Sequence, residues 1–253
     1  MATPDAGTRK RKADNTPEGE TKKFKSNYSG VITVSVGSDN IEFTVHQDLI
    51  CDRSPFFKAA CSRNWTEAKE RRINLPDQNP KAIKIYFEWA YSQRQDLGDL
   101  ARAVIKSEVP QLRAEQMSNR SWREETFIIL RDLWVLADYL GDNVFKNITM
   151  DSLIDERNAG RIVHNKAIVH ESFERTRLGS QLQTWIADRL LTVLSPDDPI
   201  RFADDWPLSV ALVLLSRLLV KKGRLDKEEG LLLSRKCDYH EHADGAESCD
   251  QRT

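Results

Sequence analysis

Residues 43–57 constrain the fold of this chain more than any other segment, because a strand runs directly into helical sequence there. Val45 belongs to an alternation of apolar and polar residues that is typical of a half-buried strand. The alternation ends at His46, where the pattern becomes helical. Ser54 followed by Pro55 then has the form of an N-cap with proline at the first helical position. The segment predicts a strand followed by two short helices.

Further strand signals surround this unit. Residues 31–36 and residues 41–45 each have the alternating side chains of a β-strand, and the Gly-Ser-Asp-Asn sequence at 37–40 between them is typical of a turn. This pattern predicts a β-hairpin. A short strand follows at residues 72–75 and is closed by Pro76. Strands and helices are therefore interleaved in the first part of the chain.

The helices that follow have recognisable ends. Pro80 opens a helix with apolar residues at i, i+3, i+4 and i+7. Residues 93–120 are rich in Gln, Arg, Glu and Ser, and we interpret them as a charged insert with a loose surface helix. A strong helix is predicted at residues 121–140. Gly141 ends that helix, and Asn143 is predicted to cap the next one.

Beyond residue 160 the apolar spacing is helical throughout, at residues 162–173, 182–194 and 208–220. The last stretch is shorter than the roughly 18 to 20 residues of a membrane span, so we predict a core helix there. Interleaved strands and helices followed by helices alone predict an α+β domain with an all-helical extension.

The composition excludes several classes of protein. The chain has 253 residues, 40% of them hydrophobic, and a net charge of −1, which suits neither a nucleic-acid coat nor an acidic solubilising protein. The N-terminus lacks the apolar centre of a signal peptide, and four cysteines fit a reducing compartment. We expect a protein inside the cell, without a membrane span or specific nucleic-acid binding.

Four stretches of the sequence resemble the BTB/POZ interaction domain, and together they cover roughly residues 28–155. In its charged insert and helical tail the chain is similar to fungal BTB proteins with a helical C-terminal extension. The resemblance implies a small sheet flanked by a helical cluster, then a helical extension at 156–235 and a tail at 236–253. The four stretches are the 31–46 hairpin, residues 48–60, residues 73–76 with the 80–91 helix, and residues 133–142.

The resemblance implies protein binding, either dimerisation or recruitment of a cullin-type ubiquitin ligase scaffold. Adaptors in the family carry a hydrophobic residue, any residue and then Glu after the Ser-Pro-Phe helix, and Trp65-Thr66-Glu67 stands in that place. A large apolar anchor beside a charge suits a binding hot spot, so Trp65 and Glu67 are predicted to contact the partner. The alternative is that Trp65 closes the local core while Glu67 is solvated.

Homodimerisation has weaker support in the sequence. Family members that dimerise usually have an Asp shortly before the first strand of the hairpin and a basic residue after the His. Here Ser29-Gly30 and Gln47 occupy those places, so this charge pair is absent. Homodimerisation through apolar contacts remains an alternative.

One pair of residues invites a catalytic interpretation. His46 and Cys51 lie five positions apart, and a Cys–His pair can drive nucleophilic catalysis. The resemblance favours a His that ends a strand and a Cys that faces the core. The sequence also has no phosphate-cradling glycine loop and no serine-centred elbow. We therefore predict no enzyme, no catalytic residue and no cofactor.

Residues 1–27 form a basic arm with almost no apolar residues, which predicts disorder. Its clusters Lys10-Arg11 and Lys22-Lys23-Phe24-Lys25 are spaced as an acidic two-site nuclear import receptor requires. We predict nuclear import through Lys10, Arg11, Lys22, Lys23 and Lys25, and a location in the nucleus, the cytoplasm or both. The alternatives are a solubilising arm or nonspecific contact with nucleic acid.

The tail contains Cys237, His240, His242 and Cys249. Two thiolates and two imidazoles suit tetrahedral zinc, which makes these residues a candidate structural metal site. Their spacing is not that of a standard zinc finger. The alternative is a tail that docks on the helical extension.

These features favour a non-catalytic interaction module, first of all a substrate adaptor for a cullin-type ubiquitin ligase. In that case the C-terminal helices or the insert would hold the substrate. The alternative is a nuclear transcription or chromatin scaffold that uses the BTB surface for dimerisation or corepressor recruitment.

Overall fold

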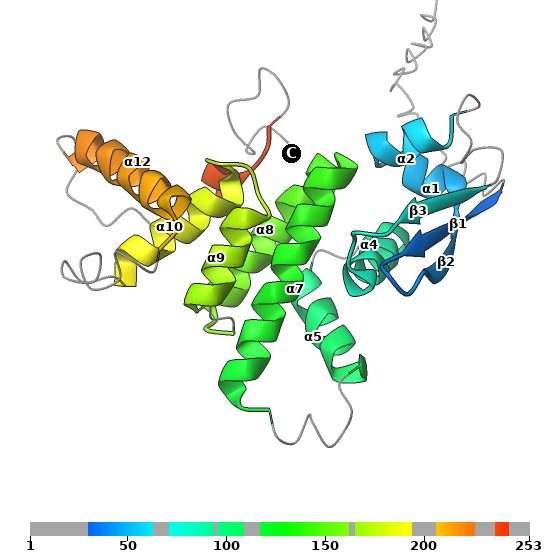
Figure 1. Ribbon diagram of the computed structural model, residues 1–253, viewed down its shortest axis with the longest axis horizontal. Coiled ribbons are helices and arrows are strands. Elements are labelled where there is room, and N and C mark those ends of the chain that lie inside the picture. The colour runs from blue at the N-terminus through cyan, green and yellow to red at the C-terminus, as the bar shows by residue number, and fades with distance from the viewer. Residues whose placement is uncertain are drawn as a thin grey trace, which may run out of the picture.

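The protein is elongated, with a small sheet at one end, a long central helix and a helical pair at the other end (Figure 1). The computed structural model describes residues 30–62, 71–93, 96–108, 117–161, 165–193, 206–225 and 236–242. The first elements are β1 (Val31–Val36), β2 (Ile41–His46), α1 (Gln47–Cys51), α2 (Pro55–Ala60), β3 (Arg72–Leu75), α4 (Pro80–Ser92) and α5 (Leu97–Glu108). The later elements are α7 (Asn119–Leu140), α8 (Asn143–Asn158), α9 (Lys166–Glu174), α10 (Gln181–Val193), α12 (Leu208–Leu225) and the 3₁₀ turn η2 (Lys236–Tyr239).

The sheet has the strand order β2-β1-β3. The predicted hairpin is confirmed: β1 pairs with β2 in antiparallel fashion, with Val34 opposite Phe43. Gly37, in the turn between them, has a φ of +74°, a conformation that glycine adopts without steric cost. The short strand β3 lies parallel to β1 on its other side. The strands bury Val34, Val36 and Ile73 toward the helices.

Helix α2 begins as predicted, with Ser54 as the N-cap and Pro55 at the first position. The Ser54 hydroxyl accepts a hydrogen bond from the Phe57 amide at 3.2 Å and donates one to the Leu140 carbonyl at 2.7 Å. Ser54 is buried, so both bonds are shielded from water. The cap of α2 therefore also fixes the end of α7.

Helix α8 is capped by Asp142, not by Asn143 as predicted. The Asp142 carboxylate accepts from the Phe145 amide at 2.9 Å and from the Tyr86 hydroxyl at 3.1 Å. Asn143 is the first helical residue. Burial raises the pKa of Asp142 more than these hydrogen bonds lower it. The cap joins α4 to α8 beside the cluster of Tyr86, Trp89 and Phe145 rings.

Helix α5 lies within the predicted insert, but it is not a loose surface helix. It packs against α4, α7 and α8 and buries its apolar residues, Leu97, Leu100, Ala101, Val104 and Ile105. A side chain at Gly98 would collide with the Glu156 carboxylate, so a larger residue there would displace that side chain. The prediction failed because the burial of this apolar set depends on its packing against α4, α7 and α8.

Helix α7 ends at Gly141 as predicted, with a left-handed C-cap. It begins at Asn119 with Ser118 as its N-cap, slightly before the predicted start. The later helices also occur where apolar spacing predicted them, although α9 begins only at Lys166, capped by Asn165. Among the described residues, no helix is both long and apolar enough to cross a lipid bilayer.

Candidate interaction surfaces

A partly exposed aromatic pair lies where α2 meets the end of α7. The ring centroids of Phe56 and Tyr139 are 5.0 Å apart, and about half of Tyr139 is exposed. Val144, in the first turn of α8, is also about half exposed. Phe56 rests on Phe57, which is fully buried. Exposed aromatic rings held by a buried base are typical of protein-binding sites.

The predicted contact residues Trp65 and Glu67 lie outside the described residues, in the segment that follows α2. The described chain stops at Ser62 and resumes at Arg71. The import residues Lys10, Arg11, Lys22, Lys23 and Lys25 also lie outside the described residues. These assignments stay predictions.

His46 and Cys51 make separate contacts. The His46 Nδ1 atom is 2.8 Å from the Tyr91 hydroxyl, and that hydroxyl also accepts from the His46 amide at 3.0 Å. The Cys51 thiol is half-buried and packs against the core, as predicted, and it donates to the Phe57 carbonyl at 3.5 Å. A hydrogen bond with the Cys61 thiol, together with burial, raises the pKa of Cys51. A raised pKa opposes the thiolate that a nucleophile requires.

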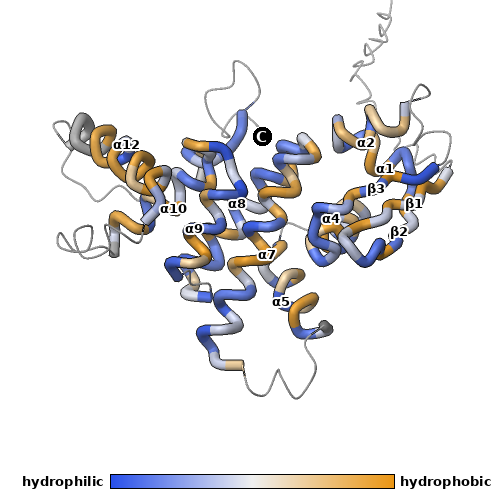
Figure 2. The backbone as a smooth tube through the Cα atoms, in the orientation of Figure 1, coloured by the Kyte–Doolittle hydropathy of each residue, from blue (hydrophilic) through white to orange (hydrophobic). Residues whose placement is uncertain are grey.

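An exposed apolar surface lies on one face of α12, which we call the leucine face. It consists of Leu208, Leu212, Leu215 and Leu219, which are between 46% and 73% exposed. Figure 2 shows hydrophobic residues along the length of α12. These four leucines recur at spacings of four, three and four, which places them on one side of the helix.

The opposite face of α12 packs on α10 and α9. Val210 and Val213 are buried there, and the Arg217 guanidinium bonds the Asp188 carboxylate at 2.7 Å and 3.0 Å. The predicted core helix is therefore buried on one face only. A helix that is apolar on all sides is normally buried on all sides, so the leucine face is typical of a binding surface.

The C-terminal segment 236–242 docks on α8 and α10. Tyr239 is buried, and its hydroxyl donates to the Asp188 carboxylate at 2.9 Å. The Asn147 side chain bonds both the amide and the carbonyl of Glu241, at 2.8 Å and 2.9 Å. The Glu241 carboxylate is 2.7 Å from the buried ammonium of Lys146. This is the docked tail that the sequence left as an alternative to zinc.

Three of the four predicted zinc ligands lie in the described chain. His240 Nε2 is 3.0 Å from an Asp151 oxygen, and Cys237 Sγ is 3.2 Å from His242 Nε2. Cys249 lies outside the described residues. Within the described part of the chain, no three Cys, His, Asp or Glu side chains form a group that could hold a metal ion. The zinc site stays a prediction, which metal analysis of the purified protein tests.

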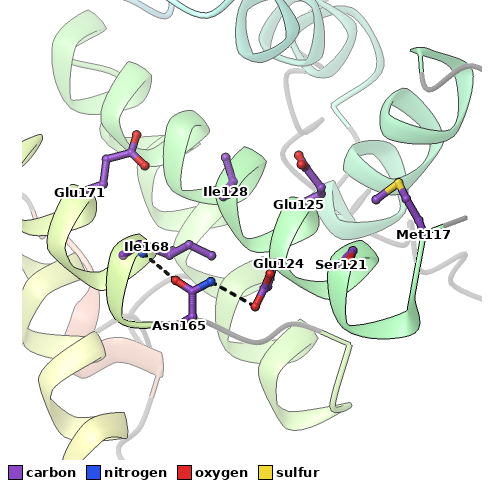
Figure 3. Close-up of a pocket in the computed structure, with 9 residues that line it drawn as sticks. Met117, Ser121, Glu124, Glu125, Ile128, Asn165, Ile168 and Glu171 are labelled. Atoms are coloured by element: carbon purple, nitrogen blue, oxygen red, sulfur yellow. Dashed lines mark hydrogen bonds between the residues drawn. The ribbon is translucent and has the colours of Figure 1, made fainter. Parts of the chain in front are cut away.

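A hollow of about 450 Å³ lies between α7 and α9 and is lined by Glu124, Glu125 and Glu171 (Figure 3). Asn165 spans its floor, donating to Glu124 at 3.2 Å and accepting from the first turn of α9 at 3.0 Å. Arg120 also pairs with Glu124, at 3.1 Å. Asn165 and Arg120 thus bond one of the lining carboxylates. The bonds of Asn165 hold α9 against α7.

The sheet and the helices around it correspond to a known family. Residues 24–114 match the family model of the BTB/POZ domain. The chain contains a BTB/POZ domain. The described elements within those bounds are the three strands and helices α1, α2, α4 and α5. BTB/POZ domains are protein–protein interaction modules, so this part of the chain belongs to that functional class.

The BTB/POZ match ends before α7, whereas the resemblance extended to residue 155. Helices α7 and α8 nevertheless share a core with the matched region, since α7 packs against α2, α4 and α5. The leucine face of α12 was missed as a binding surface. Its signal was present in the sequence, because apolar residues occupy both sides of residues 208–220.

Tyr239→Ala should release the C-terminal segment from the helices that follow the BTB/POZ domain. Losing a buried aromatic ring and its hydrogen bond should lower the free energy of unfolding by about 2–4 kcal/mol in urea titrations. Tyr239→Phe should cost about 1 kcal/mol, since only the hydrogen bond is lost. Tyr139→Phe is the matched control at an exposed position, and should change stability by less than about 0.5 kcal/mol. Equal stability of wild type and Tyr239→Ala would contradict the docking.

Proposed function

We propose that the protein is a substrate adaptor for a cullin-type ubiquitin ligase and joins two proteins without chemistry of its own. The observation that carries this proposal is the separation of two exposed apolar surfaces. The Phe56–Tyr139 pair lies near the BTB/POZ end, and the leucine face of α12 lies at the opposite end of the molecule (Figure 1). Such a body can bind one protein at each end.

The BTB/POZ end is the proposed scaffold-binding end. Trp65 and Glu67 occupy the positions that the family's adaptor pattern requires. In the sequence they follow α2, the helix that carries Phe56. A scaffold bound there would bury an aromatic anchor at the Phe56–Tyr139 pair and place Glu67 where its charge orients the partner.

The leucine face is the proposed substrate-binding end, and its occupant is an amphipathic helix of the substrate. Leucines at alternating spacings of four and three form the seam by which two helices pack side by side. Helix-in-groove recognition uses apolar anchors at the same spacings. All four residues of the face are leucines, so burial of apolar area would provide most of the binding energy.

A nuclear transcription or chromatin scaffold is the second candidate, and the basic arm favours it. In that case the BTB/POZ surface would bind a second copy or a corepressor-like partner. Replacing Lys22, Lys23 and Lys25 by alanine should then move a tagged protein out of the nucleus. An unchanged nuclear concentration would contradict the import assignment in either function.

The adaptor proposal predicts a stoichiometric complex with the N-terminal half of a cullin of the BTB-binding class, measured by light scattering after gel filtration. Trp65→Ala should weaken the complex by about 2 kcal/mol or more, roughly 30-fold, because an aromatic hot spot is lost. Glu67→Lys and Tyr139→Ala should weaken it by about tenfold each.

The double variant Leu212→Ser, Leu215→Ser is the matched control, because it alters the far end of the molecule. It should bind the cullin fragment as wild type does. Absence of a complex would refute the adaptor function, and the protein's own mass in that run would distinguish a monomer from a dimer. A complex that Trp65→Ala and Glu67→Lys leave unchanged would refute the residue assignment alone.

A further inference from the structure

A second hollow, also of about 450 Å³, lies between α5, the first half of α7 and Arg161, three residues beyond the end of α8. We call it the basic pocket. Its charged lining residues are all cationic: Arg102, Lys106, Arg123 and Arg161. Trp122 forms part of its wall and is itself half-buried against the core. Positive charge beside an aromatic wall is the composition of a site for an anionic ligand with an apolar part.

Two of the four cations are already paired. Arg161 bonds both carboxylate oxygens of the buried Glu156, at 3.1 Å and 3.0 Å, and Arg102 pairs with Glu156 and with Asp99. Burial raises the pKa of Glu156, but the bonds from Arg161 and Arg102 lower it further, so it lies below the usual value. Glu156 is therefore ionised at neutral pH, and its carboxylate is paired with these two arginines.

The other two cations account for an excess of positive charge. Lys106 and Arg123 are exposed, and no carboxylate among the described residues forms an ion pair with either. Arg102 and Arg161 face three carboxylates, Glu156, Asp99 and Asp96, so the four cations leave a surplus of one positive charge at the pocket. A ligand with carboxylates would complement Lys106 and Arg123 without disturbing the Glu156 pairs.

The chemistry favours a peptide over a nucleic acid. A single-stranded nucleic acid needs a groove of cations along its backbone and stacking surfaces for successive bases. Here one tryptophan and four cations converge on one hollow, and the whole chain has a net charge of −1. A compact site with one aromatic wall suits a short peptide that has carboxylates next to a large apolar side chain.

We propose that the basic pocket binds an acidic peptide segment of a partner protein, with carboxylates at Lys106 and Arg123 and a neighbouring apolar side chain against Trp122. The pocket lies away from both the Phe56–Tyr139 pair and the leucine face. The inference therefore goes beyond the adaptor function and does not depend on cullin binding.

The test measures fluorescence anisotropy of a short labelled peptide of Glu and Asp residues that contains one Leu-Leu pair, added to the full chain at low salt. Arg123→Glu and Lys106→Glu should each weaken binding by about tenfold, because each exchanges attraction for repulsion. Lys58→Glu on α2 makes the same change in net charge at an exposed position far from the pocket, and should bind as wild type does. Equal effects of Arg123→Glu and Lys58→Glu would overturn the proposal.

Two further experiments separate the apolar and ionic contributions to peptide binding. A peptide with the same charges but without the leucines should bind more weakly to wild type, and Trp122→Leu should reduce that difference. Binding should decline as salt rises, since the contacts are ionic and exposed. A labelled single-stranded oligonucleotide that binds with the same dependence on Arg123, while the acidic peptide does not bind, would overturn the peptide assignment.

Discussion

The arrangement of the whole molecule depends on one buried carboxylate in the central helix. Asp132 of α7 is only 5% exposed and accepts hydrogen bonds from three sides. Its donors are Arg131 at 2.8 Å, Arg175 after α9 at 2.5 Å, and Asn79 at the start of α4 at 2.8 Å. A buried charge with fewer partners would cost several kcal/mol, so its position fixes all three donors.

Because Asn79 caps α4 and Arg175 follows α9, Asp132 connects the BTB/POZ domain to the helical extension through a single side chain. Ring stacking and a further hydrogen bond add to this connection. Phe127 of α7 stacks on Trp185 of α10 at 6.3 Å, and Ser54 joins α2 to the end of α7. The two apolar ends are therefore held at a fixed distance, as expected of a protein that positions one partner relative to another.

Local signals predicted most of the fold. The hairpin, the Ser54-Pro55 cap and the Gly141 stop were correct because each depends on residues close together in sequence. Helix α5 was misjudged because its burial depends on α7 and α8, which come later in the chain. Asp142 was missed as a cap because the neighbouring Asn143 is an equally good capping residue, and the bond from the distant Tyr86 to Asp142 is not visible in the sequence.

The candidate sites were less accessible to sequence analysis. The basic pocket combines α5, α7 and Arg161, and no local pattern connects residues so far apart. Docking of the tail on the helical extension was one alternative from the sequence, but its contact between Tyr239 and Asp188 depends on the packing of α10. The leucine face differs, because residues 208–220 already showed apolar residues on both sides. Only the position of α10 decides which side is covered.

Native-state hydrogen exchange tests most directly whether the BTB/POZ domain and the extension form one body. Buried backbone amides of α4, α7 and α10 should exchange with the same free energy of opening, close to that of global unfolding, because Asp132 and the shared core unite them. Exchange of α9 and α10 through a separate opening, at a much lower free energy than α4, would contradict the account. The two apolar ends would then not be held at a fixed distance.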